Sequence, residues 1–180
     1  MRFISALYRG LDCITELTGK CIIWLTLLVV INTCVVVALR YFFSGGSIAI
    51  QESLTYIHAT LFMLAMGYAL KHGSHVRVDI FYRNFTPRTQ ALVDVLGALL
   101  CLLPLSVLIF VMSWDYVMAS WAVHEVSTEG GGIKGVYLLK TLMLLLPVTL
   151  IIQGVAELLK NLLFFFGKGG SHTPEQMEPL

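Results

Sequence analysis

The sequence alternates between long apolar stretches and short polar segments. Its apolar stretches cover about residues 21–39, 48–70, 91–112 and 137–166. A helix needs about 20 apolar residues to cross the hydrocarbon core of a bilayer. Each stretch therefore predicts one transmembrane helix, and together they predict a single four-helix membrane domain over residues 1–166.

A second periodicity precedes the first predicted span, in residues 2–20. Apolar residues recur there at steps of three and four: Phe3, Leu7, Leu11, Ile14 and Leu17. Charged residues occupy the opposing side: Arg9, Asp12, Glu16 and Lys20. This pattern is typical of an amphipathic helix that lies in the headgroup region of a membrane.

The composition agrees with this pattern and excludes a soluble domain. Hydrophobic residues make up 57% of the chain and charged residues 13%, against roughly 45–50% and about 25% in average globular proteins. The fold class we expect is therefore all-α and integral to the membrane. No basic block stands outside the segments that flank the spans, so nucleic acid is not an expected partner. The four cysteines form no CxxC pair and indicate no thiol redox site.

The distribution of basic residues predicts the orientation of the spans. Nine lie before the first span, between the second and third, or at the C-terminal end of the chain: Arg2, Arg9, Lys20, Lys71, Arg77, Arg83, Arg88, Lys160 and Lys168. The other two connections hold only Arg40 and Lys134. The positive-inside rule thus places both termini and the middle loop in the cytoplasm. The tail 167–180 is polar and rich in Gly and Pro, which predicts disorder.

Polar residues inside the spans are candidates for contacts between helices. Asn32 is alone in the first span, and an amide in mid-membrane faces another helix. In the second span, Gln51, Thr55 and His58 share one face. We expect His58 to be satisfied by a neighbouring helix rather than to bind haem or carry protons. Glu52 lies near the end of its span, where a carboxylate is solvated or interacts with the helix N-terminus.

Two local signals concern the third span. Thr86 followed by Pro87 predicts a helix N-cap with proline in the first turn. Pro104 lies inside the span and should kink it, because it lacks a backbone donor and clashes with the preceding turn.

Motifs for catalysis or metal binding are not found. His124 and Glu125 begin an HExxH motif, but position 128 is threonine where the second histidine is required. His72, His75 and Asp79 lie together in a basic loop, which is weak support for a metal site. We therefore expect no enzyme activity, no catalytic residue, no bound metal and no cofactor.

Several short motifs resemble those of one transporter family. They are Gln51-Glu52-Ser53, then Gly67, Ala69-Leu70, Gly73 and His75-Val76-Arg77-Val78-Asp79, then Pro87-Arg88, and in the last span Lys140, Pro147 and Gln153-Gly154. With four spans and this length, the chain resembles the DctQ-like small membrane subunit of tripartite ATP-independent periplasmic (TRAP) transporters.

The resemblance implies a division of labour among three proteins in the bacterial cytoplasmic membrane and periplasm. A large multi-span subunit carries the sodium and substrate sites, and a periplasmic binding protein delivers an organic acid. Dicarboxylates, keto acids and sialic acid all remain open as substrates. The small multi-pass subunit is non-catalytic, braces the large one and contributes to docking of the binding protein.

Three groups of residues receive roles in this hypothesis. Contacts with the large subunit are expected from Asn32, Gln51, Glu52, Thr55, His58, Arg77 and Asp79. Anchoring to phospholipid and the interface is expected from Trp24, Arg77, Arg83, Arg88 and Lys160. Docking of the binding protein is expected from Arg40, Ser44, Ser47, Glu125, Glu129 and Lys134. For Arg77 and Asp79, a local ion pair is the alternative.

Two other functions stay open at this point. One is a self-sufficient four-span carrier that works as a dimer, with Glu52 or His58 as the coupling group. The other is a membrane redox subunit, although only His58 lies clearly inside a span and a dihaem protein needs paired histidines.

Overall fold

The computed structural model describes residues 2–43, 45–73 and 85–165, and within them all regular structure is helical. The helices are α1 (Arg2–Phe42), α2 (Ile48–Lys71), α4 (Pro87–Gly97), α5 (Leu103–Ala122) and α6 (Val136–Phe165). A π-helical turn, η1 (Ala98–Leu102), joins α4 to α5. The expected residues Ser44, Arg77, Asp79 and Arg83 and the tail 167–180 lie outside the described residues.

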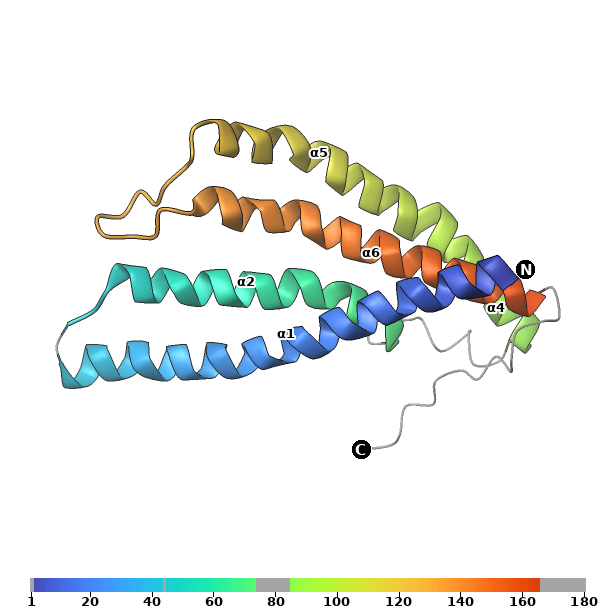
Figure 1. The fold of residues 1–180 in the computed structure, drawn as a ribbon, viewed down its shortest axis with the longest axis horizontal. Coiled ribbons are helices and arrows are strands. Elements are labelled where there is room, and N and C mark those ends of the chain that lie inside the picture. Colours follow the sequence, from blue (N-terminus) through green and yellow to red (C-terminus); the bar gives the residue numbers. More distant parts are fainter. Residues whose placement is uncertain (1, 44, 74–84, 166–180) are drawn as a thin grey trace.

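Four helical segments are long and apolar enough to cross a membrane, which confirms the predicted number of spans in the described part of the chain. They are Ala6–Phe42, Ile48–Lys71, Pro87–Ala122 and Val136–Phe164. In Figure 1, the loops after α1 and α5 lie at one end of the bundle, whereas the start of α1 and the end of α6 lie at the other.

Helix α6 lies at the centre of the bundle. It packs against α1, α2, α4, η1 and α5, whereas α1 and α2 form an antiparallel pair on one side and α5 lies on the other. Small residues permit close packing on α6. A Cβ atom on Gly67 of α2 would lie 2.9 Å from the backbone oxygen of Thr149, and one on Gly154 would lie 2.7 Å from Leu102. Small residues at helix contacts are typical of membrane bundles, because they let backbones approach closely.

Helix α5 meets α6 along a row of serines. Ser106, Ser113 and Ser120 are buried and recur every seven residues. A spacing of seven keeps side chains on one stripe of a helix that packs along its neighbour. Ser106 also donates a hydrogen bond to the carbonyl oxygen of Leu102, at 2.7 Å, so its hydroxyl is satisfied within the helix.

The two local predictions for the third span can be traced in the structure. Thr86 is the N-cap of α4 and accepts a hydrogen bond from the backbone N–H of Thr89 at 3.4 Å, with Pro87 as the first helical residue. Near Pro104, the backbone N–H of Leu103 bonds the oxygen of Ala98, which lies five residues back rather than four. Sharp kinks in helices are often found at such π turns and at prolines. The structure thus shows a widened turn just before Pro104, and the kink expected at this residue stays a prediction.

The N-terminal region differs from the expected pair of separate segments. Residues 2–20 and the first span form one uninterrupted helix of 41 residues. At 1.5 Å per residue it is about 60 Å long, roughly twice the thickness of a hydrocarbon core. Leu7, Ile14 and Leu17 are exposed, whereas Asp12 and Glu16 are half-buried. Of the four charged residues in the predicted amphipathic pattern, Asp12 and Glu16 lie on the side of α1 that packs against α2, whereas Arg9 and Lys20 are exposed.

Candidate functional site

A stripe of polar residues runs along the outer face of α2. Gln51, Thr55, His58 and Phe62 are exposed, and their spacing of four, three and four residues puts them on one face of the helix. The other sides of α2 are used within the bundle, since Ser53 contacts α1 and Gly67 contacts α6. We call Gln51, Thr55 and His58 the outer stripe.

The outer stripe is a costly surface to expose to lipid. His58 is the eleventh of the 24 residues of α2 and so lies near the middle of the span. Among the described residues, none of the three side chains has a hydrogen-bonding partner, and His58 lacks the neighbouring helix that was expected to satisfy it. Polar groups at membrane depth need partners, because hydrocarbon offers none. The outer stripe therefore has the properties of a helix face that packs against another membrane helix.

Asn32 finds its partner inside the chain. Its amide nitrogen donates to the hydroxyl of Ser53 at 2.8 Å and to the backbone oxygen of Ile50 at 3.4 Å. The residue was expected to contact another subunit, but α2 lies against α1 at this height and satisfies the amide. Asn32 thus joins the first two helices.

Glu52 also interacts within the chain, although it was expected at the subunit interface or as a solvated carboxylate. Its carboxylate accepts hydrogen bonds from the hydroxyl of Ser127 and from the backbone N–H of Ile133, the latter at 2.6 Å. Both partners belong to the loop between α5 and α6. One carboxylate therefore ties this loop to the first turns of α2.

A second contact secures the base of the same loop. Lys140 of α6 forms an ion pair with Glu125 and lies over the ring of Tyr116, 4.1 Å from its centroid. The hydrogen bond from the Lys140 ammonium holds the pKa of the Glu125 carboxyl below its ordinary value of 4.5. Nearby, the indole N–H of Trp121 donates to the hydroxyl of Thr141 at 2.9 Å. These aromatic and charged side chains hold the C-terminal end of α5 against the N-terminal part of α6.

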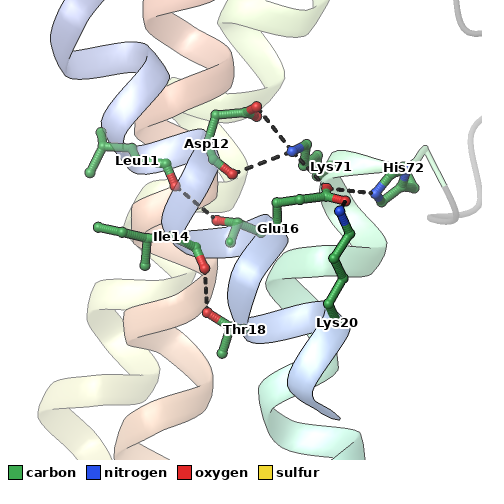
Figure 2. Close-up of polar contacts among 9 residues, drawn as sticks. Leu11, Asp12, Ile14, Glu16, Thr18, Lys20, Lys71 and His72 are labelled. Carbon is green, nitrogen blue, oxygen red and sulfur yellow. Dashed lines mark hydrogen bonds and ion pairs between the residues drawn. The ribbon is translucent and has the colours of Figure 1, made fainter. Parts of the chain in front are cut away.

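A charged cluster lies at the opposite end of the bundle and joins α1 to α2. The ammonium of Lys71 lies 2.9 Å from carboxylate oxygens of both Asp12 and Glu16. Glu16 also lies 3.2 Å from Lys20 and 3.3 Å from the imidazole Nε2 of His72. Figure 2 shows Lys71 reaching between the two carboxylates from the end of α2. Sequence reasoning missed this cluster, because it assigned Lys71 only to the orientation of the chain.

The remaining expected site residues in the described part of the chain are exposed, and all but Trp24 lie toward one of the two ends. Arg40, Ser47, Glu129 and Lys134 lie in or beside the loops that follow α1 and α5. Arg88 is the second residue of α4, and Lys160 lies near the end of α6, both at the other end of the bundle. Trp24 is exposed on α1. Among the described residues, no group of three or more histidine, cysteine or carboxylate side chains is placed to hold a metal ion.

Comparison with known proteins identifies the family. A family model described as "Tripartite ATP-independent periplasmic transporters, DctQ component" matches residues 29–164. Comparisons with curated proteins and with solved structures gave no match. The family match covers most of the chain and includes the outer stripe, the Glu52 contact and the α5–α6 loop. It implies partnership with a large membrane subunit and a binding protein. The chain belongs to the DctQ family and is a small membrane component of a tripartite ATP-independent periplasmic transporter.

Proposed function

We propose that this chain is the non-catalytic small subunit of a sodium-coupled importer of organic acids in the bacterial inner membrane. It braces the large transport subunit through the outer stripe of α2. Its loops after α1 and α5 contribute to docking of the periplasmic binding protein. Trp24, Arg88 and Lys160, with Arg77 and Arg83 in the middle loop, anchor it to phospholipid.

One observation carries the bracing role. The outer stripe exposes Gln51, Thr55 and His58 on the face of α2 that points away from the rest of the bundle. Lipid cannot satisfy these side chains, and among the described residues the chain offers them no partner. A helix of the large subunit would supply hydrogen bonds at this face, and family membership supports the presence of such a subunit.

The docking role is supported by the position of the loops. The connections after α1 and after α5 lie at the end opposite to Lys71 and Arg88. The distribution of basic residues puts this end on the periplasmic side. Arg40, Ser47, Glu129 and Lys134 are exposed there and are available to a soluble protein.

Reconstitution of the transporter tests the proposal. The chain is co-expressed with the large membrane protein encoded beside it, and the two should remain together through detergent extraction. In liposomes, uptake of an organic acid should require both chains, the neighbouring binding protein and an inward sodium gradient. Solute flux in liposomes that hold only this chain would contradict the proposal and favour a self-sufficient dimeric carrier.

A further inference from the structure

Glu52 joins the two sides of the α5–α6 loop at its neck. The two oxygens of its carboxylate accept hydrogen bonds from Ser127 and Ile133, which lie 75 and 81 residues further along the chain. Ser127 and Ile133 also pair directly, since the backbone N–H of Ser127 donates to the oxygen of Ile133 at 3.2 Å. The neck of the loop is thus closed by one backbone bond and by both oxygens of a single side chain.

The tip of the loop, residues 128–132, has little structure of its own to hold its shape. It contains Gly130, Gly131 and Gly132, and Gly131 has a φ of 89°. Within the tip, the N–H of Gly132 donates to the oxygen of Glu129 at 3.0 Å. A second bond, from the N–H of Glu129 to the hydroxyl of Ser127 at 3.2 Å, joins the tip to the neck. Glycine loses the most backbone freedom on ordering, so a stable shape needs an external support.

The Glu52 carboxylate is such a support. Hydrogen bonds to an ionised acceptor are shorter and about twice as strong as neutral ones. Packing around the carboxylate is also tight, because a Cβ atom on Gly132 would lie 2.4 Å from the Ser127 hydroxyl and 2.7 Å from Glu52 Oε1. Only glycine at position 132 leaves room for the carboxylate to reach the neck.

We propose that Glu52 is a positioning residue that holds the 127–133 loop in the shape recognised by the binding protein. This inference rests on the proposed function. The neighbouring residues Gln51 and Glu52 of α2 then contact different partners. Gln51 faces the large subunit, whereas Glu52 faces the loop and acts on the soluble partner.

The first experiment measures the loop directly in the purified complex. Hydrogen–deuterium exchange at the amide of Ile133 should accelerate at least about tenfold in Glu52→Ala, as loss of a hydrogen bond to a charged acceptor predicts. Gly132→Ala should have the same effect, because its methyl group displaces the carboxylate. Gly130→Ala is the matched control for exchange, since a Cβ atom there meets nothing within 4 Å.

The second experiment measures docking. The complex of the small and large subunits is placed in lipid nanodiscs. It is then titrated with the purified binding protein whose gene lies beside those of the two subunits. Glu52→Ala should raise the dissociation constant about tenfold, and Ser127→Ala should raise it by less because one carboxylate bond remains. In liposomes, the half-saturating concentration of binding protein should rise, whereas the rate at saturation should equal that of the wild type. Retention of the large subunit should not change.

Each contrary outcome has a distinct meaning. Unchanged exchange at Ile133 in Glu52→Ala would overturn the positioning role. Faster exchange with an unchanged dissociation constant would overturn the link to docking, while the proposed function stands. If wild-type uptake does not depend on the binding protein at all, the proposed function fails and this inference fails with it.

Discussion

The ammonium of Lys71 lies 2.9 Å from the carboxylate of Asp12, although the two residues are 59 positions apart in the chain. This contact sets the rotation of α1 about its axis. It turns Asp12 and Glu16 toward α2 and leaves Leu7, Ile14 and Leu17 on the outside. The N-terminal half of α1 therefore presents apolar residues to its surroundings and keeps its acidic residues in the bundle.

Replacing Lys71 should loosen the N-terminal half of α1. Lys71→Met leaves two half-buried carboxylates without their shared cation, and the side chain of Lys71 is only 18% exposed. We expect a loss of roughly 1–3 kcal/mol in the free energy of unfolding, in line with hydrogen bonds to charged groups. Thermal unfolding in detergent measures the change. Lys20→Met is the matched control and should have little effect, because Lys20 is 67% exposed.

Adding a methyl group at Gly67 should separate α2 from α6. In Gly67→Ala, the new atom would lie 2.9 Å from the backbone oxygen of Thr149, which cannot move without shifting α6. Overpacking of this kind costs roughly 1–3 kcal/mol of unfolding free energy. Gly97→Ala provides the contrast, since its Cβ atom meets nothing within 4 Å and alanine favours the helix by up to about 1 kcal/mol. Equal melting temperatures for the two variants would disprove close packing at Gly67.

The outer stripe should matter for assembly and not for the fold of the chain. His58→Leu, alone or with Gln51→Leu and Thr55→Val, should leave the melting temperature of the isolated chain unchanged or higher. Each lost contact should weaken the complex with the large subunit by about 0.6 kcal/mol, the average for hydrogen bonds between membrane helices. Energy transfer between labelled subunits in nanodiscs measures the change.

Thr33→Val is the control for these variants. Thr33 is exposed on α1, but its hydroxyl already donates to the backbone oxygen of Val29 at 2.7 Å. Its loss should not affect the complex. If Thr33→Val and His58→Leu weakened the complex equally, the outer stripe would not be the interface.

The ion pair of Glu125 with Lys140 should give the protein a defined acid sensitivity. Because its pKa is lowered by the Lys140 hydrogen bond in the folded state, ionised Glu125 stabilises the fold. That contribution is complete above the ordinary carboxyl pKa of 4.5 and disappears as the pH falls through the lowered value. The difference in melting temperature between wild type and Glu125→Gln should therefore be constant near neutral pH and vanish in acid. Glu129→Gln should show no such difference, since Glu129 has no ion-pair partner in the described part of the chain.

The orientation of the bundle can be read by chemical labelling in cells. In a variant without the four native cysteines, Glu129→Cys should react with a membrane-impermeant maleimide added outside. Arg88→Cys should react only after the membrane is permeabilised, because the positive-inside rule retains that end in the cytoplasm. The reverse pattern would invert the topology and remove the loops from the reach of a periplasmic protein.

Sequence periodicity predicted the features that depend on neighbours along one helix. The four spans, the cap at Thr86 and the common face of Gln51, Thr55 and His58 are of this kind. Hydropathy and the 3.6-residue repeat are sufficient for the spans and the common face, and the Thr-Pro pair is sufficient for the cap.

Features that depend on which helices meet were not predictable in this way. Lys71 contacts Asp12, 59 residues away in the chain, and Glu52 contacts Ser127, 75 residues away. Neither contact can be predicted from the spacing of residues within one helix. The sequence showed that Glu52 is near the end of a span, but not that a loop folds back to it. The partner of Asn32 was not predictable for the same reason, because it depends on the position of α2 beside α1.

The central position of α6 has a consequence for biosynthesis. Every helix that packs on α6 precedes it in the chain, so none of these contacts can form before α6 is made. Until the ribosome has passed residue 165, the surfaces around Gly67 and Ser113 that will contact α6 face the bilayer or the insertion machinery. The α1–α2 pair does not depend on α6, because these two helices also pack against each other. The final helix joins this pair to α4, η1 and α5 and so completes the bundle.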